Sequence, residues 1–334
     1  PLRIRVTQTP RKSSSKRNRS KKPGKRDKDH SQPPANIFHI FSPQGVTLKE
    51  VSTITAGLLH RQSKHKLMIH IIPKPTDTPT DNSTGMVQEE LRRRGVPFVN
   101  LDLASVDPFD LPVFGETIWA CGIKQDGVQF ELLKALELEN HVINSPEAIA
   151  ICASKVTTTA KILRAGAPSP ATCFTNSKEK VQKFLDAHGG KAVYKPVYGF
   201  DGNGIYLFHS ADEIKEEPPY YVQEYVKNDR DYRIFVIDYE AVGAIKRESP
   251  HLTHNIHQGG CGRAVEIPKD MAEAAEGAAR AVGIDYCGVD LLPLEDGGYT
   301  VLEVNGTPNW HCMTAPIPKL LADYLIRQDK EGRK

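Results

Sequence analysis

The sequence predicts an α/β domain over residues 36–145, followed by an α+β region over residues 146–330 with antiparallel sheets. Up to residue 145, segments typical of strands and helices alternate, which indicates an open α/β sheet. Beyond residue 146, several β-rich runs follow one another with short turns between them, and this pattern favours antiparallel pairing. We divide the second region into subdomains over residues 146–222 and 223–330.

In the first domain, ANIFHIFS and KLMIHII predict strands, with a helix over residues 46–62 between them. The segment MVQEELRRRG predicts a helix that ends at Gly95, a usual residue for a helix C-terminus. The strands VPFVNLD, ETIWACGI and HVIN follow, with a helix near residues 127–139 before the last of them. We expect Trp119 and Cys121 in the core of this domain.

In the second region, PEAIAICASKVTTTAKILRAG predicts helix throughout, and another helix is expected near residues 177–188. The runs KAVYKPV, GIYLF, YYVQEYV, YRIFVID and AVGAIKR predict strands. An alanine-rich helix near residues 269–282 then leads to a pair of strands, CGVDLLPL and GYTVLEVN.

The net charge of +3 conceals a basic N-terminal arm. Residues 1–35 contain twelve Lys or Arg and two acids, a net charge of +10, whereas the other residues carry −7. Such a composition buries too little apolar surface to offset the entropy of ordering, so the arm is predicted to be disordered. It has two interpretations: a nucleic-acid or polyanion contact through counterion release, or a solubilising extension. The lack of aromatic residues among the bases favours the extension.

The composition also excludes several classes of protein. No run of eighteen apolar residues occurs, so a helix that spans a membrane is not expected. No apolar stretch precedes a small-residue cleavage site near the N-terminus, so secretion is not predicted. The six cysteines are scattered without a CxxC pair, which disfavours a zinc ribbon or a disulfide framework. We therefore expect a soluble cytoplasmic protein.

A glycine-rich loop follows the strand that ends near Lys195. Gly199, Gly202 and Gly204 have β-favouring residues on both sides, so they predict a hairpin loop and not a dinucleotide-binding turn. Backbone amides of such a loop can approach a polyphosphate because no Cβ intervenes, and Lys195 would add a point charge. The alternative is an ordinary hairpin with a surface lysine.

The last predicted hairpin brings three oxygen-bearing side chains together. With Asp296-Gly297 as a two-residue turn, Asp290 lies opposite Glu303, and Asn305 follows on the same face. The opposite face would be a core face made of Val289, Leu291, Leu302 and Val304.

Two carboxylates opposite each other repel by about 4 kcal/mol at about 4 Å and an effective dielectric constant near 20. Either one of them takes up a proton, or a cation lies between them. Carboxylate and amide oxygens select hard cations, so we expect Mg²⁺ or Mn²⁺. A solvated polar face is the alternative, but it does not account for Asn305.

Several motifs occur together in one order: a lysine before a helix, then YKPVYGFDGNGI, VQEYV, DYRIFVI, NIHQGG, GVDLL and LEVNGTP. In this order they resemble the ATP-grasp superfamily, and within it the RimK-like ligases, which join glutamate or similar amino acids through an amide bond. The resemblance implies an α/β domain followed by an α+β ATP-grasp fold, in which two subdomains clasp ATP.

The resemblance implies an ATP-dependent carboxylate–amine ligase that uses ATP and two Mg²⁺ or Mn²⁺ ions. Its substrates would be L-glutamate and a small carboxylate acceptor, such as a pterin or deazaflavin coenzyme that ends in glutamate. A protein C-terminus is an alternative acceptor. A degenerate ATP-grasp protein that binds nucleotides or polyanions through the basic arm is an alternative of another class.

The resemblance also assigns individual residues. Those implied to hold ATP are the phosphate-binding Lys155 and Lys195, the lid glycines Gly199, Gly202 and Gly204, the adenine hinge Glu224, Tyr225 and Val226, and the ribose-binding Asp231. Those implied to face the transferred phosphoryl group are Arg247, Asn255 and again Lys195. Those implied to hold the metal ions are Asp290, Glu303 and Asn305.

The acceptor side is less defined by sequence. Thr253 stands where relatives can place a basic residue, which leaves the acceptor contact open. The segment Trp310-His311-Cys312 follows the predicted metal-binding strand and either walls the acceptor pocket or simply packs. We expect a homo-oligomer, no membrane partner, and contact with nucleic acid only through residues 1–35.

Overall fold

The computed structural model describes residues 68–111, 113–124, 127–199, 202–249, 251–253 and 261–331. The basic arm, the strand expected over ANIFHIFS and the helix expected over residues 46–62 lie outside these residues. The described residues form three sheets: one parallel and two antiparallel. The expected change from an alternating α/β pattern to antiparallel sheets is therefore confirmed for the described part of the chain.

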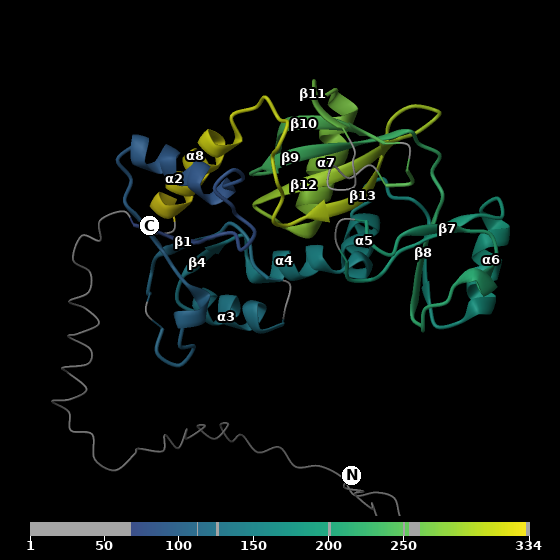
Figure 1. Ribbon diagram of the computed structural model, residues 1–334, viewed down its shortest axis with the longest axis horizontal. Coiled ribbons are helices and arrows are strands. Elements are labelled where there is room, and N and C mark those ends of the chain that lie inside the picture. Colours follow the sequence, from purple (N-terminus) through teal and green to yellow (C-terminus); the bar gives the residue numbers. More distant parts are fainter. Residues whose placement is uncertain are drawn as a thin grey trace, which may run out of the picture. The chain divides into compact units, whose positions relative to one another are not determined.

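The first sheet is parallel and has the strand order β2-β1-β3-β4. Figure 1 labels two of its strands, β1 and β4. Its elements in chain order are β1 (Ile69–Ile72), α2 (Ser83–Arg93), β2 (Phe98–Asn100), η1 (Leu103–Ser105), β3 (Thr117–Ala120), α3 (Gly127–Glu137) and β4 (His141–Ile143). Successive side chains along each strand point to opposite faces of the sheet. Ile71 and Trp119 therefore pack with α2 on one face, whereas Ile72 and Ile118 pack with α3 on the other. Trp119 and Cys121 are buried, as expected.

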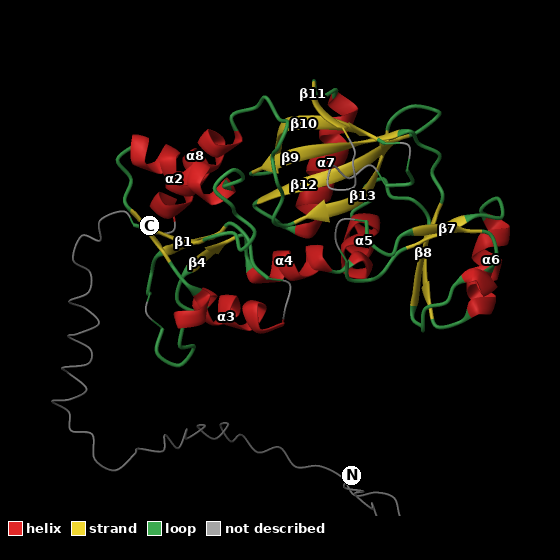
Figure 2. Ribbon diagram, viewed as in Figure 1, coloured by secondary structure: helices red, strands yellow, loops and turns green. Residues whose placement is uncertain are grey.

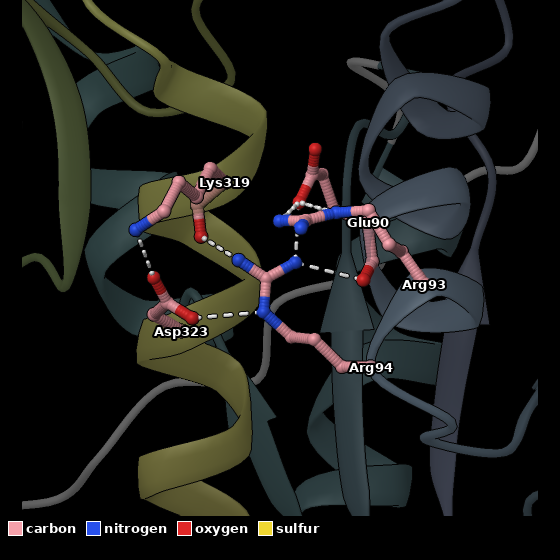
Figure 3. A network of polar contacts seen from close by, with 5 residues as sticks. All are labelled: Glu90, Arg93, Arg94, Lys319 and Asp323. Carbon is pink, nitrogen blue, oxygen red and sulfur yellow. Dashed lines mark hydrogen bonds and ion pairs between the residues drawn. The ribbon is translucent and has the colours of Figure 1, made fainter.

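Helix α2 also contacts the last helix, α8 (Ile317–Glu331). Figure 3 shows Arg94, just past the end of α2, between the two helices. Its Nε donates to Asp323 Oδ1 at 2.9 Å, its Nη2 donates to the Lys319 carbonyl oxygen at 3.3 Å, and it pairs with Glu90 of its own helix. The next residue, Gly95, has a φ of +66°, so it ends α2 in the left-handed conformation that glycine adopts without strain.

The second sheet is antiparallel, with the strand order β5-β8-β6-β7. The elements from the parallel sheet to its end are α4 (Pro146–Ala153), α5 (Lys155–Arg164), β5 (Thr172–Thr175), α6 (Lys178–Ala187), β6 (Ala192–Tyr194), β7 (Tyr206–Phe208), η2 (Ala211–Glu213) and β8 (Tyr220–Glu224). Helix α6 covers this sheet through Val181 and Leu185, which pack against Val222. We call these four strands the lid sheet.

The prediction of one continuous helix from residue 146 is wrong, because the structure has two helices here. Ser154 has extended backbone angles (φ −107°, ψ 110°), and its hydroxyl oxygen accepts a hydrogen bond from the Thr157 amide as the N-cap of α5. Serine competes with helix continuation in this way because its short side chain bonds to the nearby backbone. The break makes Lys155 the first residue of α5.

The third sheet is antiparallel, with the strand order β11-β10-β9-β12-β13. Its elements are β9 (Arg230–Ile237), β10 (Glu240–Glu248), β11 (Cys261–Val265), α7 (Lys269–Val282), β12 (Tyr286–Pro293) and β13 (Tyr299–Asn305). Figure 2 shows α7 alongside these strands, and its alanine-rich face packs on Ile234, Val289 and Val304. We call this the C-terminal sheet.

The hairpin of β12 and β13 has the predicted pairing but not the predicted turn. Asp290 lies opposite Glu303, as expected, whereas Pro293 pairs with Tyr299, so residues 294–298 form the loop. A β-bulge beside Asp290 restores the register, and it places Leu302 outside the core face to which we assigned it. Val301 takes that place in the core, and Leu302 lines a cavity.

Among the helices that the structure describes, none is both long enough and apolar enough to cross a membrane.

Candidate functional site

A cavity of about 360 Å³ is lined by residues of both the lid sheet and the C-terminal sheet. It brings together most of the site residues predicted from the sequence, namely Lys155, Lys195, Gly199, Gly202, Glu224, Tyr225, Val226, Asp231, Arg247, Asp290, Glu303 and Asn305. Gly204 is not part of the wall, and Asn255 lies outside the described residues. Thr253 also lines the cavity.

Two lysines reach the cavity from the lid side. Lys155 begins α5, and its Nζ donates to the Gly199 carbonyl oxygen at 3.2 Å and lies 3.6 Å from Glu303 Oε2. Lys195 follows β6 and donates from Nζ to Gln223 Oε1 at 2.5 Å. Burial is the main cause that lowers the pKa of Lys195 to about 8, and nearby Lys155 acts in the same direction. Lys195 is therefore a buried cation whose hydrogen-bond partner is neutral.

The glycine loop joins β6 to β7, so the predicted hairpin is confirmed. Gly202 and Gly204 have φ values of +73° and +71°, which residues with a Cβ rarely adopt. A Cβ at Gly204 would also lie 3.0 Å from Pro196 Cγ. Gly204 therefore shapes the loop, while Gly199 and Gly202 form part of the cavity wall.

The residues expected to form an adenine hinge lie at and just past the end of β8, and their role at adenine stays a prediction. Glu224 is anchored there, because its Oε1 accepts from the Ala171 amide at 3.0 Å and its own amide donates to the Ala171 carbonyl oxygen at 2.9 Å. The Tyr225 ring lies 4.4 Å from Lys191 Nζ, a cation–π contact. The following residue, Val226, lines the cavity as well.

A buried cluster of two acids and two arginines forms the wall on the C-terminal sheet. Arg247 donates to both carboxylate oxygens of Asp231, at 2.6 and 2.8 Å, and its Nη2 lies 3.0 Å from Asp290 Oδ2. Arg233 donates to both oxygens of Asp290 at 2.8 Å. Burial alone would raise the pKa of Asp290, but Arg233 and Arg247 together hold it well below its ordinary value.

Sequence reasoning missed Arg233. Arg233 could be predicted only from the strand order. It lies opposite Asp290, on β9 beside β12, which follows once these strands are known to be neighbours. Arg233 and Arg247 offset the charge of Asp290, so the repulsion between the two carboxylates does not by itself require a proton or a cation, and a cation at these residues stays a prediction. Since Asp231 gives both oxygens to Arg247, its role at the ribose stays a prediction.

The oxygens at the end of the hairpin suit a hard cation. Glu303 faces Asp290 across β12 and β13, and its side chain is about one-third exposed in the cavity wall. Asn305 donates from Nδ2 to the Gly288 carbonyl oxygen at 3.3 Å, so its Oδ1 remains an acceptor. Oxygens of two carboxylates and one amide on neighbouring strands fit Mg²⁺ or Mn²⁺ chemically. Their role as metal ligands stays a prediction.

The segment after β13, residues 310–312, contributes one residue to the core and one to the cavity wall. Trp310 is buried in the core beside Phe235, whereas His311 lines the cavity. Of the two interpretations of this segment, packing therefore describes Trp310, and a place in the pocket wall describes His311.

Comparison with known proteins agrees with this geometry. The description of a RimK-like ATP-grasp domain matches residues 152–326. The tetrahydromethanopterin:alpha-L-glutamate ligase of Methanocaldococcus jannaschii is 33% identical over 60% of this chain and 74% of its own length. N-acetylaspartylglutamate synthase A of Mus musculus is 27% identical over 60% of this chain and 58% of its own.

Solved structures agree on the fold. The ATP-grasp ligase PsnB, complexed with a minimal precursor, superposes with a TM-score of 0.61 at 24% identity, over 78% of this chain and 99% of that one. The cavity between the lid sheet and the C-terminal sheet thus belongs to a fold that the sequence motifs, the matched domain and the solved relative all share. This chain is a member of the RimK-like ATP-grasp family and an ATP-dependent ligase of the alpha-L-glutamate ligase group.

Proposed function

We propose that this cavity binds ATP with two Mg²⁺ or Mn²⁺ ions and joins L-glutamate to a small-molecule carboxylate acceptor through an amide bond. The observation that carries the proposal is one cavity with two lysines on one wall and hard oxygen donors on the other. Lys155 and Lys195 suit phosphate oxygens, and Glu303 with Asn305 suits the accompanying cations.

The proposed reaction needs an activated acyl group, because a free carboxylate is a poor electrophile. An oxygen of the acceptor carboxylate attacks the γ-phosphorus of ATP, the bond to the bridging oxygen breaks, and ADP leaves. The glutamate amine then attacks the acyl carbon, the C–N bond forms, phosphate leaves, and the amine gives up its proton. Catalysis by this chain would consist of positioning and charge neutralisation.

Each residue would have a role in this reaction that follows from its position in the cavity. Lys155 at the start of α5 and Lys195 just after β6 would hold phosphate oxygens, and Arg247 would face the phosphoryl group during transfer. The metal ions would supply further positive charge at the phosphates. Asp231 fixes the Arg247 guanidinium by a bidentate ion pair, so this donor is already oriented in the protein alone. The glycine loop would exclude water from the acyl-phosphate.

The acceptor is proposed from the relatives. One of them is named for tetrahydromethanopterin and alpha-L-glutamate and another for N-acetylaspartylglutamate, so glutamate appears in both names. We favour a coenzyme of the pterin or deazaflavin type that ends in glutamate.

The test is ADP formation by the purified chain with L-glutamate and each of three acceptors: tetrahydromethanopterin, N-acetylaspartate and a peptide that ends in glutamate. The expected result is ADP formation that requires L-glutamate and is highest with the coenzyme. Turnover only with the peptide would move the activity to protein C-termini. No ADP with any of them, from a protein that is folded by circular dichroism, would refute the proposed function.

A further inference from the structure

Two loops meet at one end of the cavity. The loop between β1 and α2 covers residues 73–82, and the loop between β13 and α8 covers residues 306–316. Lys74 Nζ of the first loop donates to Asn309 Oδ1 of the second, and Asp81 Oδ1 lies 3.0 Å from His311 Nε2. Asn309 and His311 line the cavity, and Lys74 holds Asn309 from behind, whereas Asp81 lies near His311 without forming a hydrogen bond. The loop after the first strand of the parallel sheet therefore fixes the position of one cavity residue, Asn309.

The contact with Lys74 determines which way the Asn309 amide points. An ammonium group can only donate hydrogen bonds, so the oxygen of the amide must face Lys74 and its NH₂ group must face away. No other partner of the Asn309 side chain is found among the residues that the structure describes. The amide thus has two unused donor hydrogens in a residue of the cavity wall.

Lys74 is itself held in place. Its amide donates to Thr84 Oγ1 at 3.0 Å, and its aliphatic stem crosses Gly122, where an added Cβ would lie 2.8 Å from Lys74 Cγ. Burial lowers the pKa of its ammonium, while the nearby acids Asp77 and Asp81 oppose that change. Glycine at position 122 leaves the space through which Lys74 reaches Asn309.

Two positive charges lie at this end of the cavity, and each has carboxylates nearby: Arg233 binds Asp290, and Lys74 lies near Asp77 and Asp81. Arg233 lines the same cavity, and Lys74 lies near enough for the two positive charges to act on each other. Each substrate of the proposed ligase carries a carboxylate close to the reacting atoms. A neutral amide donor backed by a fixed ammonium can bind one carboxylate oxygen without adding a further charge to the site.

We propose that Asn309 is a substrate-recognition residue, which Lys74 orients so that the amide NH₂ group donates to a carboxylate oxygen of L-glutamate or of the acceptor. The inference rests on the proposed function and deepens it. Lys74 is a positioning residue in this arrangement, because it touches Asn309 and does not line the cavity.

Asn309→Asp is the decisive variant. Aspartate has the same shape and keeps, or strengthens, the contact with Lys74, so a purely structural role predicts no loss. A recognition role predicts that the second carboxylate oxygen repels the substrate carboxylate. We expect KM for L-glutamate or for the acceptor to rise about 10- to 100-fold, with KM for ATP changed less than twofold.

Two further variants act on Asn309 indirectly. Lys74→Met removes the ammonium and keeps most of the stem, and Gly122→Ala displaces the stem without changing any charge. Both should raise the same KM as Asn309→Asp, by about tenfold. Asp81→Asn is the matched control, because it weakens the other contact between the two loops and leaves Lys74 and Asn309 intact. It should leave both substrate KM values within twofold.

We measure KM for L-glutamate and KM for the acceptor separately. The acceptor is whichever of tetrahydromethanopterin, N-acetylaspartate or the peptide is turned over. The KM that rises identifies which carboxylate Asn309 binds. Unchanged KM values in Asn309→Asp, or a parallel rise in KM for ATP, would overturn the inference while wild-type turnover upholds the proposed function. If the wild type forms no ADP with any of the acceptors, the proposed function is refuted, and the inference with it.

Discussion

The cavity has two cationic walls that differ in how their charges are compensated. On the lid side, Lys195 has a neutral hydrogen-bond partner, and Lys155 has a backbone carbonyl with one carboxylate 3.6 Å away. On the C-terminal sheet, Arg233 and Arg247 are bound by the carboxylates of two aspartates at distances of 2.6–3.0 Å. One wall therefore keeps positive charge for a ligand, while the other is a nearly neutral, rigid cluster.

This difference indicates how the protein prepares for an anionic ligand. Burying an ammonium without a carboxylate partner costs free energy, and the lowered pKa of Lys195 reflects that cost. In the arginine cluster, the carboxylate partners of each guanidinium offset much of the cost of burial. Changes in the lysine wall should therefore act mainly on nucleotide binding, and changes in the arginine wall should act on stability as well.

The largest effect is expected from the two carboxylates of the proposed metal site. Asp290→Asn and Glu303→Gln should each reduce turnover about 1000-fold or more, because each removes an oxygen ligand of the proposed cations. Only Asp290→Asn should also destabilise the fold, by about 3–5 kcal/mol, because it leaves the buried Arg247 and the partly buried Arg233 without their shared carboxylate. Urea unfolding of both variants beside ADP-formation rates measures the two effects.

Glu303→Gln is the matched control for stability, since the Glu303 side chain is about one-third exposed and its ion pair with Lys155 is long. Equal loss of stability in the two variants would show that the two walls do not differ as described. Full activity in both variants would refute the metal assignment.

A smaller effect is expected on the lysine wall. Lys195→Met should raise KM for ATP about 10- to 100-fold, because it removes one charged donor to the phosphates. Its free energy of unfolding should change by less than about 1 kcal/mol, because the lost hydrogen bond to Gln223 is offset by no longer burying an ammonium. Steady-state kinetics and urea unfolding test the two parts, and a loss of several kcal/mol would contradict the second.

The same lysine should also make stability and ATP binding depend on pH. The pKa of Lys195 is about 8 in the folded protein and near 10.5 for a free lysine, so the unfolded state binds more protons between these values. Stability should therefore rise as pH increases from about 8 to 10.5, by up to about 3 kcal/mol. In the same range, KM for ATP should rise by up to about tenfold per pH unit as the ammonium loses its proton.

The difference in unfolding free energy between the wild type and Lys195→Met isolates this one group, since other titrating residues are common to both proteins. A difference that stays constant from pH 7 to pH 10 would show that Lys195 keeps an ordinary pKa.

Much of the fold was predictable, because local signals decided it. The end of α2 at Gly95, the β6–β7 glycine hairpin and the pairing of Asp290 with Glu303 followed from glycine conformation and strand alternation. The break at Ser154 was not predicted, since a serine N-cap inside an apolar run looks like helix continuation. Strands β5 and β11 and helix α8 were also missed.

The candidate site was predictable where a motif or one hairpin holds its residues. Arg233 and Asn309 were missed because their partners lie far along the chain, and only tertiary packing brings them together. Arg233 meets Asp290 between β9 and β12, and Asn309 meets Lys74 from a loop of another sheet. Such contacts depend on strand order and sheet packing, which local pattern does not contain.

The bulge in β13 has a consequence for how this hairpin tolerates change. It places Leu302 and Glu303, which are neighbours in the chain, on the same cavity wall, so one strand offers an apolar surface and a carboxylate side by side. Because the extra residue sits within the strand, the alignment of Asp290 with Glu303 is set there and not by the connection over residues 294–298. We therefore expect that this connection can be lengthened, or carry a grafted peptide tag, without shifting Asp290 and Glu303 against each other.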